Sequence, residues 1–250
     1  MARYFVELAY KGTNYHGWQI QQNAHSVQEE VNKALSTLLQ KEIMITGAGR
    51  TDTGVHAEQL FAHFDSNQSI DTAQLLFKLN SFLPADIACN QIFEVKEDDH
   101  ARFSATYRTY EYRISTTKNP FTTELAHYFP YKLDIEKMNE AAELLIQETD
   151  FSCFSKSKTD TFTNMCHITE AYWKTHNEQL IFTVTANRFL RNMVRAIVGT
   201  LLDVGQQKIK VEELTEIIAS KNRSNAGKSV PAHGLFLTKI GYPFLKEVKG

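Results

Sequence analysis

The hydrophobic positions of this chain follow two periods that alternate along its length. A period of two is typical of half-buried β-strands. It occurs, for example, where Leu60, Ala62 and Phe64 alternate with Gln59 and His63. The strands predicted in this way cover residues 3–10, 43–46, 59–64, 87–96, 102–115, 166–175, 180–186 and 235–240.

Segments with a helical period separate these strands. One helix is predicted to begin at Ser26, which forms a capping box with Glu29, so that the two side chains satisfy amides of the first turn. Its apolar stripe consists of Val27, Val31, Ala34, Leu35 and Leu38. Further helices are predicted from Asp71 to before Pro84, from near Asp134, and over residues 190–204 and 211–220.

The mixture of strands and helices predicts an α+β fold. The pattern fits two similar-sized halves that share one sheet or have two abutting sheets. We place the boundary inside the long strand near residue 105, which gives halves of residues 1–105 and 106–250. A chain of 250 residues, 42% of them apolar, is long enough to give each half a core.

Charge and cysteine content narrow the class of protein. The chain carries 27 basic and 29 acidic residues, and this net charge of −2 argues against an unselective polyanion binder, although a local basic groove remains compatible with it. The three cysteines have no C-x-x-C spacing, which favours reduced structural thiols. The sequence has neither a signal peptide nor an apolar run as long as a membrane span, so we expect a soluble, cytoplasmic protein.

The most unusual segment is the loop Gly47–Ala57. Its three glycines permit positive φ and close backbone approach, and they surround Arg50, Asp52 and His56. Loops held between strands often carry catalytic groups. A plainer interpretation is a tight turn in which Asp52 caps backbone amides. Composition alone favours the turn.

A second candidate segment is residues 101–113, which combine arginine and tyrosine. As a strand, it would place Arg102, Arg108, Tyr110 and Tyr112 on one face. Such a face suits a nucleic acid, because cations meet phosphates and an aromatic ring stacks on a base. Alternatively, the tyrosines pack in the core and the arginine stems lie along it.

A third candidate segment, residues 187–195, carries three arginines. Helical spacing would place Arg188, Arg191 and Arg195 on one side of a helix. That side is either a solvated basic face or a phosphate contact with one arginine that reaches a buried carboxylate.

Other motifs are incomplete. Gly227-Lys228-Ser229 is similar to the end of a P-loop, but Asn222 stands where that motif needs a glycine. No histidine spacing typical of a metal site is present.

Several segments together resemble the TruA family of tRNA pseudouridine synthases. The segment from Gly49 to His56 resembles the family signature, with Thr53 where many bacterial members have alanine. Three further segments match in the same order: residues 100–106, Tyr110-x-Tyr112, and residues 189–199. The resemblance covers nearly the whole chain.

This resemblance implies a fold, an activity and a set of site residues. The fold has mixed, largely antiparallel sheets flanked by helices, with an active-site cleft between the halves. The reaction is the isomerisation of uridine to pseudouridine at nucleotides 38, 39 and 40 of the tRNA anticodon stem-loop, without metal or cofactor. Asp52 is implied as the nucleophile, Arg195 as its ion-pair partner and Tyr110 as the residue that stacks on uracil. Further RNA contacts are implied at Arg50, Arg102, Arg108, Arg188 and Arg191, and the active form is a homodimer.

Two other classes of protein compete with this interpretation. One is an RNA-binding protein without catalysis, against which the intact set of Asp52, Tyr110 and Arg195 argues. The other is a metal-dependent nuclease that uses Asp52 and His56, which the lack of a second clustered carboxylate disfavours. The sequence leaves open whether Asp52 attacks the sugar, attacks the base or removes a sugar proton.

Overall fold

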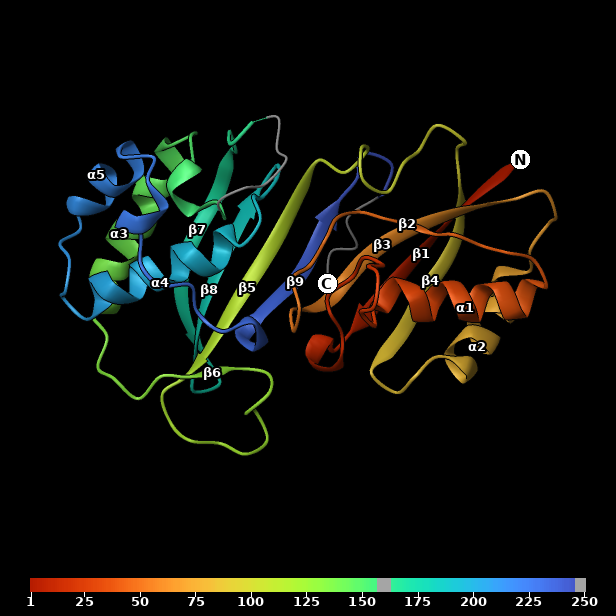
Figure 1. Cartoon of the computed structure of the whole chain (residues 1–250), viewed down its shortest axis with the longest axis horizontal. Helices are drawn as coiled ribbons and strands as arrows, with labels where there is room; N and C mark the ends of the chain where they lie inside the picture. Colours follow the sequence, from red (N-terminus) through yellow and green to blue (C-terminus); the bar gives the residue numbers. More distant parts are fainter. Residues whose placement is uncertain (157–162, 246–250) are drawn as a thin grey trace. The chain divides into compact units, whose positions relative to one another are not determined.

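The backbone contacts of the chain divide it into two compact units. The computed structural model describes residues 1–156 and 163–245. The first unit comprises Met1–Thr106 and the segment from Leu237 onward, and the second comprises Tyr107–Phe236 (Figure 1). The second unit therefore lies within the sequence of the first, whereas the sequence pattern predicted two consecutive halves.

The first unit contains a largely antiparallel sheet. Its strand order is β4-β1-β3-β9, and β2 also pairs with β3. The strands are β1 (Ala2–Tyr10), β2 (Thr46–Gly47), β3 (His56–Ser66), β4 (Ile87–Val95) and β9 (Leu235–Gly241). β1 runs antiparallel to both neighbours, with Phe5 opposite His63 on one side and Phe93 on the other. This pairing places the largely buried strand β1 in the interior of the sheet.

The two helices of the first unit begin where the sequence pattern predicts. α1 (Val27–Leu39) follows Ser26, whose hydroxyl accepts a hydrogen bond of 3.3 Å from the Glu29 amide. α2 (Thr72–Phe82) follows Asp71, which caps the amide three residues further on. α2 packs against β4, and α1 packs against α2.

The second unit is a sheet with helices packed on it. Its strand order is β5-β8-β7, and the short β6 runs parallel to β5. The strands are β5 (Tyr107–Ser115), β6 (His127–Tyr128), β7 (Ile168–His176) and β8 (Gln179–Ala186). The helices are α3 (Ile135–Gln147), α4 (Met193–Gly205) and α5 (Glu213–Ala219). α3 packs on β7, and α4 contacts both α3 and β5.

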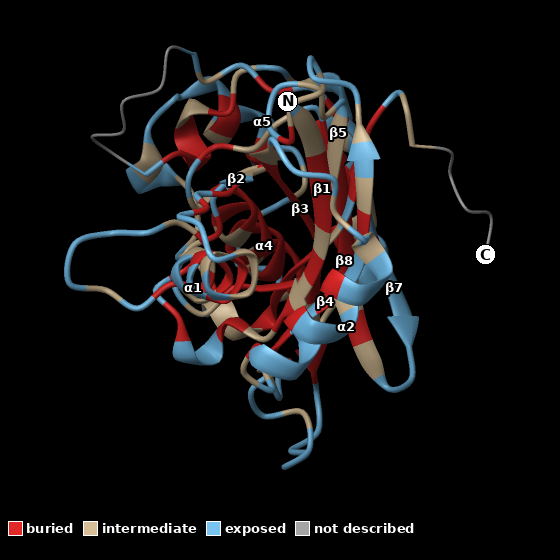
Figure 2. Ribbon diagram, turned by 90° about the vertical axis from the view of Figure 1, so that its right-hand side faces the viewer, coloured by how far each residue is buried: buried red, intermediate tan, exposed pale blue. Residues whose placement is uncertain are grey.

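Helix α4 is the central element of the second unit. Most of its residues are buried, and Figure 2 shows it almost entirely in the colour of buried residues, whereas α2 is largely exposed. Gly199 lies where a Cβ atom would be 1.8 Å from the carbonyl oxygen of Lys228. The segment around Lys228 therefore runs in backbone contact with the helix.

The α+β prediction is confirmed, but two predicted elements begin too early. Residues 101–104 form a turn, so Arg102 is not on the strand that contains Tyr110. The helix predicted from residue 190 begins at Met193, because Asn192 has a left-handed backbone with φ of 66°. In the described part of the chain, no helix has the length and apolarity needed to cross a bilayer.

Candidate active site

Asp52 lies in the first unit, on a loop that a buried hydroxyl anchors. The loop connects β2 to β3, and the Asp52 side chain is half-buried. The neighbouring Thr51 is buried, and its Oγ1 accepts a hydrogen bond of 3.1 Å from the Trp18 amide and lies 2.8 Å from the Tyr10 hydroxyl. Two distant parts of the chain therefore hold the residue that precedes the carboxylate.

Close backbone contacts hold the same loop. Gly17 has φ of 86°, and a Cβ atom there would lie 2.1 Å from the carbonyl oxygen of Thr51. Gly54 has φ of 77°, and its amide donates to the Tyr15 carbonyl at 3.3 Å. Positive φ is readily accessible to glycine, so Gly54 allows the conformation of the loop and Gly17, in the facing segment, allows the close approach of the two backbones. These contacts join the loop to the segment that contains Tyr15 and Gly17.

His56 has a structural position in this loop. It is 1% exposed, and its Nδ1 accepts a hydrogen bond of 3.0 Å from the Gly12 amide. An imidazole that accepts at Nδ1 is neutral and carries its proton on Nε2. His56 therefore joins the loop to the start of the first 3-10 helix. Among residues 1–156 and 163–245, no group of three or more His, Cys, Asp or Glu is arranged to hold a metal ion.

Arg50 lies at the exposed surface of the same loop. Its Nε donates a hydrogen bond to the side-chain oxygen of Gln19, which is the second residue after Gly17. This contact holds a cation two residues from Asp52. A guanidinium in that position can bind a phosphate group next to a nucleotide at the carboxylate.

Tyr110 lies on β5 in the second unit, with a half-buried side chain. Its ring meets the ring of Phe189 edge to face, with centroids 5.1 Å apart. Tyr112 is fully buried, and its hydroxyl donates to the Pro231 carbonyl at 2.9 Å. Burial raises the pKa of Tyr112. Tyr112 is thus a core residue, whereas Tyr110 keeps part of its ring accessible.

Arg195 lies in the first turn of α4, and both its side chain and its backbone are hydrogen-bonded to Val230. Its Nε donates to the Val230 carbonyl at 2.7 Å, and the Val230 amide donates to the Arg195 carbonyl at 3.2 Å. Further along, the Gly227 amide donates to the Thr200 hydroxyl at 2.9 Å. The segment with the incomplete P-loop motif therefore positions an arginine. Sequence reasoning missed this role, because the segment has no helical or strand period.

The other predicted arginines are dispersed. Arg108 lies on β5 and donates to the Asn187 carbonyl at 2.9 Å. Arg188 and Arg191 precede α4, so the prediction that they share one helix side with Arg195 is wrong. The cause is the left-handed Asn192, which interrupts the helical spacing.

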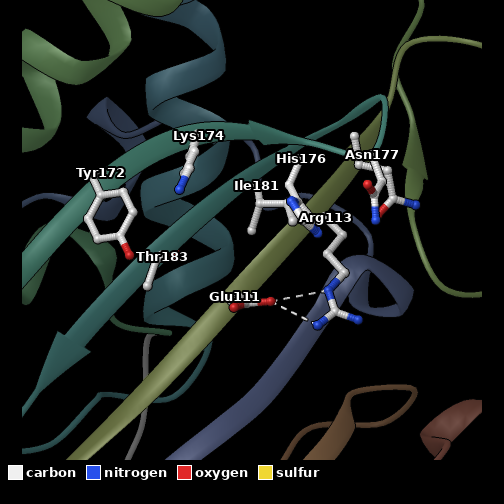
Figure 3. A pocket seen from close by; sticks show the side chains of 9 residues that line it. Glu111, Arg113, Tyr172, Lys174, His176, Asn177, Ile181 and Thr183 are labelled. Atoms are coloured by element: carbon white, nitrogen blue, oxygen red, sulfur yellow. Dashed lines mark hydrogen bonds and ion pairs between the residues drawn. The ribbon is translucent and has the colours of Figure 1, made fainter. Parts of the chain in front are cut away.

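The second unit also has a concavity of about 480 Å³ on its sheet (Figure 3). Its wall includes an ion pair in which Arg113 lies 2.8 Å from Glu111. The lining residues are Glu111, Arg113, Tyr172, Lys174, His176, Asn177, Gln179, Ile181 and Thr183. None of the predicted site residues belongs to this wall.

Tyr110 and Arg195 belong to one unit and are linked through adjacent residues. Val230 binds Arg195, and Pro231 binds Tyr112 on the strand that carries Tyr110. Asp52 belongs to the other unit. Its grouping with Tyr110 and Arg195 remains a prediction.

Comparison with known proteins identifies the class of this enzyme. The family model described as tRNA pseudouridine synthase matches residues 8–104 and 141–243. A protein named tRNA pseudouridine synthase A from Bacteroides thetaiotaomicron is 51% identical over 255 residues, covering 100% of this chain and 95% of its own. Proteins of the same name from Bacteroides fragilis and Bacillus pumilus are 51% and 41% identical, covering 96% and 94% of this chain and 96% and 97% of their own.

These matches establish the family. The chain belongs to the tRNA pseudouridine synthases and is an isomerase. Asp52 and Arg195 fall inside the matched ranges, and Tyr110 falls between them.

Proposed function

We propose that the protein converts uridine to pseudouridine at positions 38, 39 and 40 of the tRNA anticodon stem-loop, with Asp52 as the nucleophile on a flipped-out uridine. In this reaction the bond between uracil N1 and the ribose breaks, and a bond from uracil C5 to the ribose forms. The C5 hydrogen leaves as a proton and N1 gains one. The observation that carries the proposal is the anchored, half-buried carboxylate of Asp52 in a member of this enzyme family.

The anchoring of Asp52 supports its role as a nucleophile. A carboxylate whose loop is fixed by Thr51 loses little freedom when it attacks a bound nucleotide. A nucleotide within a helix is inaccessible to such a group, so the target uridine leaves the base stack first. The covalent adduct then divides one difficult rearrangement into two steps.

Arg195 is proposed as the cation that pairs with Asp52. The Val230 carbonyl occupies Nε, so the guanidinium plane is held in one orientation while its terminal nitrogens carry further donors. A cation that pairs with a carboxylate fixes its orientation, which the geometry of attack requires. Arg195 thus acts by orienting Asp52.

Tyr110 is proposed to stack on the uracil ring. The perpendicular contact with the Phe189 ring restricts the Tyr110 ring and holds it ready for a base. Stacking on an aromatic ring is worth about 1–3 kcal/mol per base. That is sufficient to retain the detached uracil while it turns, but far less than the barrier reduction that enzymes supply.

The remaining predicted residues are proposed to contact RNA. Arg50 is assigned to a phosphate beside the flipped uridine. Further RNA contacts are assigned to Arg102, Arg108, Arg188 and Arg191. We further propose that the enzyme acts in the cytoplasm as a homodimer in which one tRNA touches both subunits.

The proposal is tested by the release of tritium from uracil C5 in an unmodified tRNA transcript without added metal. Asp52→Ala should lower the rate by roughly 10⁴-fold or more, as removal of a nucleophile does. The matched control is Thr53→Ala, which changes the exposed neighbour and should leave the rate near that of the wild type. Transcripts with cytidine at nucleotides 38, 39 and 40 should release no tritium. Absence of release by the wild type, or full release by Asp52→Ala, refutes the proposal.

A further inference from the structure

The turn at residues 101–104 of the first unit presents an aromatic ring and a cation to solvent. The Phe103 side chain is 76% exposed, and the Arg102 guanidinium lies 5.5 Å from the centre of its ring. We propose that this turn is a second RNA-binding site, in which Phe103 stacks on an unpaired base of the tRNA and Arg102 contacts an adjacent phosphate. The inference rests on the proposed function, because it names a further contact with the same substrate.

The turn is rigid because His100 closes it from within. The His100 amide donates to the Ser104 hydroxyl at 2.9 Å, and the Ser104 amide donates to the His100 carbonyl at 2.9 Å. His100 Nδ1 accepts from the amides of Arg102 and Phe103 at 3.0 and 3.3 Å. The His100 ring also packs against the Phe103 ring, with centroids 4.4 Å apart. Polar contacts therefore fix the backbone of the turn, and the His100 ring packs against the exposed ring that the turn carries.

The start of the turn is anchored to the core of the first unit. His63 Nδ1 accepts from the Ala101 amide at 3.2 Å, and the Tyr242 hydroxyl donates to the Ala101 carbonyl. Arg3 donates to the Asp99 carbonyl at 3.0 Å. A ring presented on such a support loses little conformational entropy on binding, and this favours a binding function over an incidental surface residue.

The Arg102 guanidinium gives the turn a cation beside its exposed ring, although the exposed carboxylates of Glu97 and Asp98 precede it in the chain. After burial, the charges of Arg3 and Arg102 are the main factors that lower the pKa of His100. The charges of Glu97 and Asp98, just before the turn, raise the pKa of Arg3. Arg3 also pairs with Asp65, and its Nε and a terminal nitrogen lie 2.8 and 2.9 Å from the two carboxylate oxygens. The outward cation is Arg102, beside an apolar ring. A phosphate next to a base matches this pair.

The base must be unpaired, because a paired base inside a helix has both faces covered by its neighbours. A stem-loop substrate offers such bases in its loop. The structure thus assigns Phe103 to a base outside the duplex, while Tyr110 is reserved for the reacting uracil.

The test uses the full-length protein and measures the Kd for an unmodified tRNA transcript. Phe103→Leu removes the ring and keeps an apolar side chain, and it should weaken binding by about 5- to 150-fold, the range that corresponds to one stacked base. Phe103→Trp should bind at least as tightly as the wild type. The matched control is Phe77→Leu on α2, which removes a ring that is 75% exposed in the same unit and should leave Kd unchanged.

A short RNA duplex used as competitor separates base stacking from general RNA affinity. Phe103→Leu should bind this duplex as the wild type does, since no unpaired base is present. Equal tRNA affinity of Phe103→Leu and wild type overturns the inference. A loss of duplex affinity as large as the loss of tRNA affinity also overturns it. A shift of subunit stoichiometry in Phe103→Leu, measured by sedimentation, would assign the ring to a protein contact instead.

Failure of this inference is distinguishable from failure of the proposed function. A wild type that releases tritium, with unchanged tRNA binding by Phe103→Leu, refutes only the second site. A wild type that releases none refutes the proposed function, and the binding comparison still decides the role of the turn.

Discussion

Replacement of Thr51 by valine should separate tRNA binding from catalysis. Valine has the shape of threonine but lacks the hydroxyl that contacts the Trp18 amide at 3.1 Å and the Tyr10 hydroxyl at 2.8 Å. Trp18 and Tyr10 are 2% and 4% exposed, so water does not readily replace the lost partner. A buried polar group left without its partner destabilises a protein by about 1–3 kcal/mol.

The loss of these two contacts determines how much Thr51→Val should destabilise the protein. With about 1–3 kcal/mol for each, Thr51→Val should lower the free energy of unfolding by roughly 2–6 kcal/mol. For a protein of this size, each kcal/mol corresponds to about 2–4 °C in the unfolding midpoint. A shift of the adjacent carboxylate by about 1 Å would lower kcat by about 100-fold. Kd for tRNA should stay within about twofold, because Thr51 is not exposed to the substrate.

The assay combines thermal unfolding, tRNA binding and tritium release. Thr51→Ser keeps the hydroxyl and serves as the matched control, so its kcat should remain close to that of the wild type. Tyr10→Phe removes one of the two contacts. Its effect should be non-additive with Thr51→Val, because both changes break the same hydrogen bond. If Thr51→Val lowers the unfolding midpoint but leaves kcat intact, the hydroxyl stabilises the unit without positioning Asp52.

Three other changes have definite outcomes. Tyr110→Phe keeps the ring, so Kd for tRNA in a filter-binding assay should be unchanged; a large increase would show that the hydroxyl contacts RNA or the fold. Gly199→Ala places a Cβ 1.8 Å from the Lys228 carbonyl oxygen, so it should lower both thermal stability and kcat; a wild-type rate would contradict the role of that segment in positioning the arginine. Burial lowers the pKa of His63 from 6.5 to about 4. Between pH 4 and 6.5 the unfolded chain therefore binds more protons than the folded protein. The contribution of His63 to the free energy of unfolding is complete above pH 6.5 and is lost as the pH falls toward 4. His63→Asn, which keeps an acceptor for Ala101, should reduce this pH dependence, and an unchanged slope would contradict it.

Local rules in the sequence predicted the helix starts that depend on local contacts. Ser26, Asp71 and Asp134 each accept a hydrogen bond from the amide three residues later, and a helix was predicted to begin at or near each of them. A cap needs only its own first turn, so such a signal is complete within a few residues.

The errors arose where a single backbone or side chain departs from the local period. The arginine spacing before α4 suggested one continuous helix, but the positive φ of Asn192 delays its start. Arg102 was assigned to a strand, but the His100 imidazole bonds the following amides and folds them into a turn. The hydrophobic period of a sequence predicts neither a left-handed residue nor a turn closed by a side chain.

The contacts that fix the site residues were the least predictable. Thr51 depends on Tyr10 and Trp18, and Arg195 depends on Val230, across separations of 33 to 41 residues. Motif similarity predicted Asp52 and Arg195 as site residues but carried no information about the residues that support them. Such pairings become visible only when the chain is folded, because each support is an ordinary residue in its own segment.

The insertion of the second unit within the sequence of the first has a consequence for synthesis. When Thr106 leaves the ribosome, β1, β3 and β4 are complete, but β9 has not been made. Until residue 241 has been added, much of one edge of β3 has no partner, and an unpaired edge readily pairs with another chain. The second unit, whose residues 107–236 are consecutive, has all of its elements before that point. The unit that carries Asp52 is begun first and closed last, so the nascent enzyme passes through its period of greatest aggregation risk with the second unit already made.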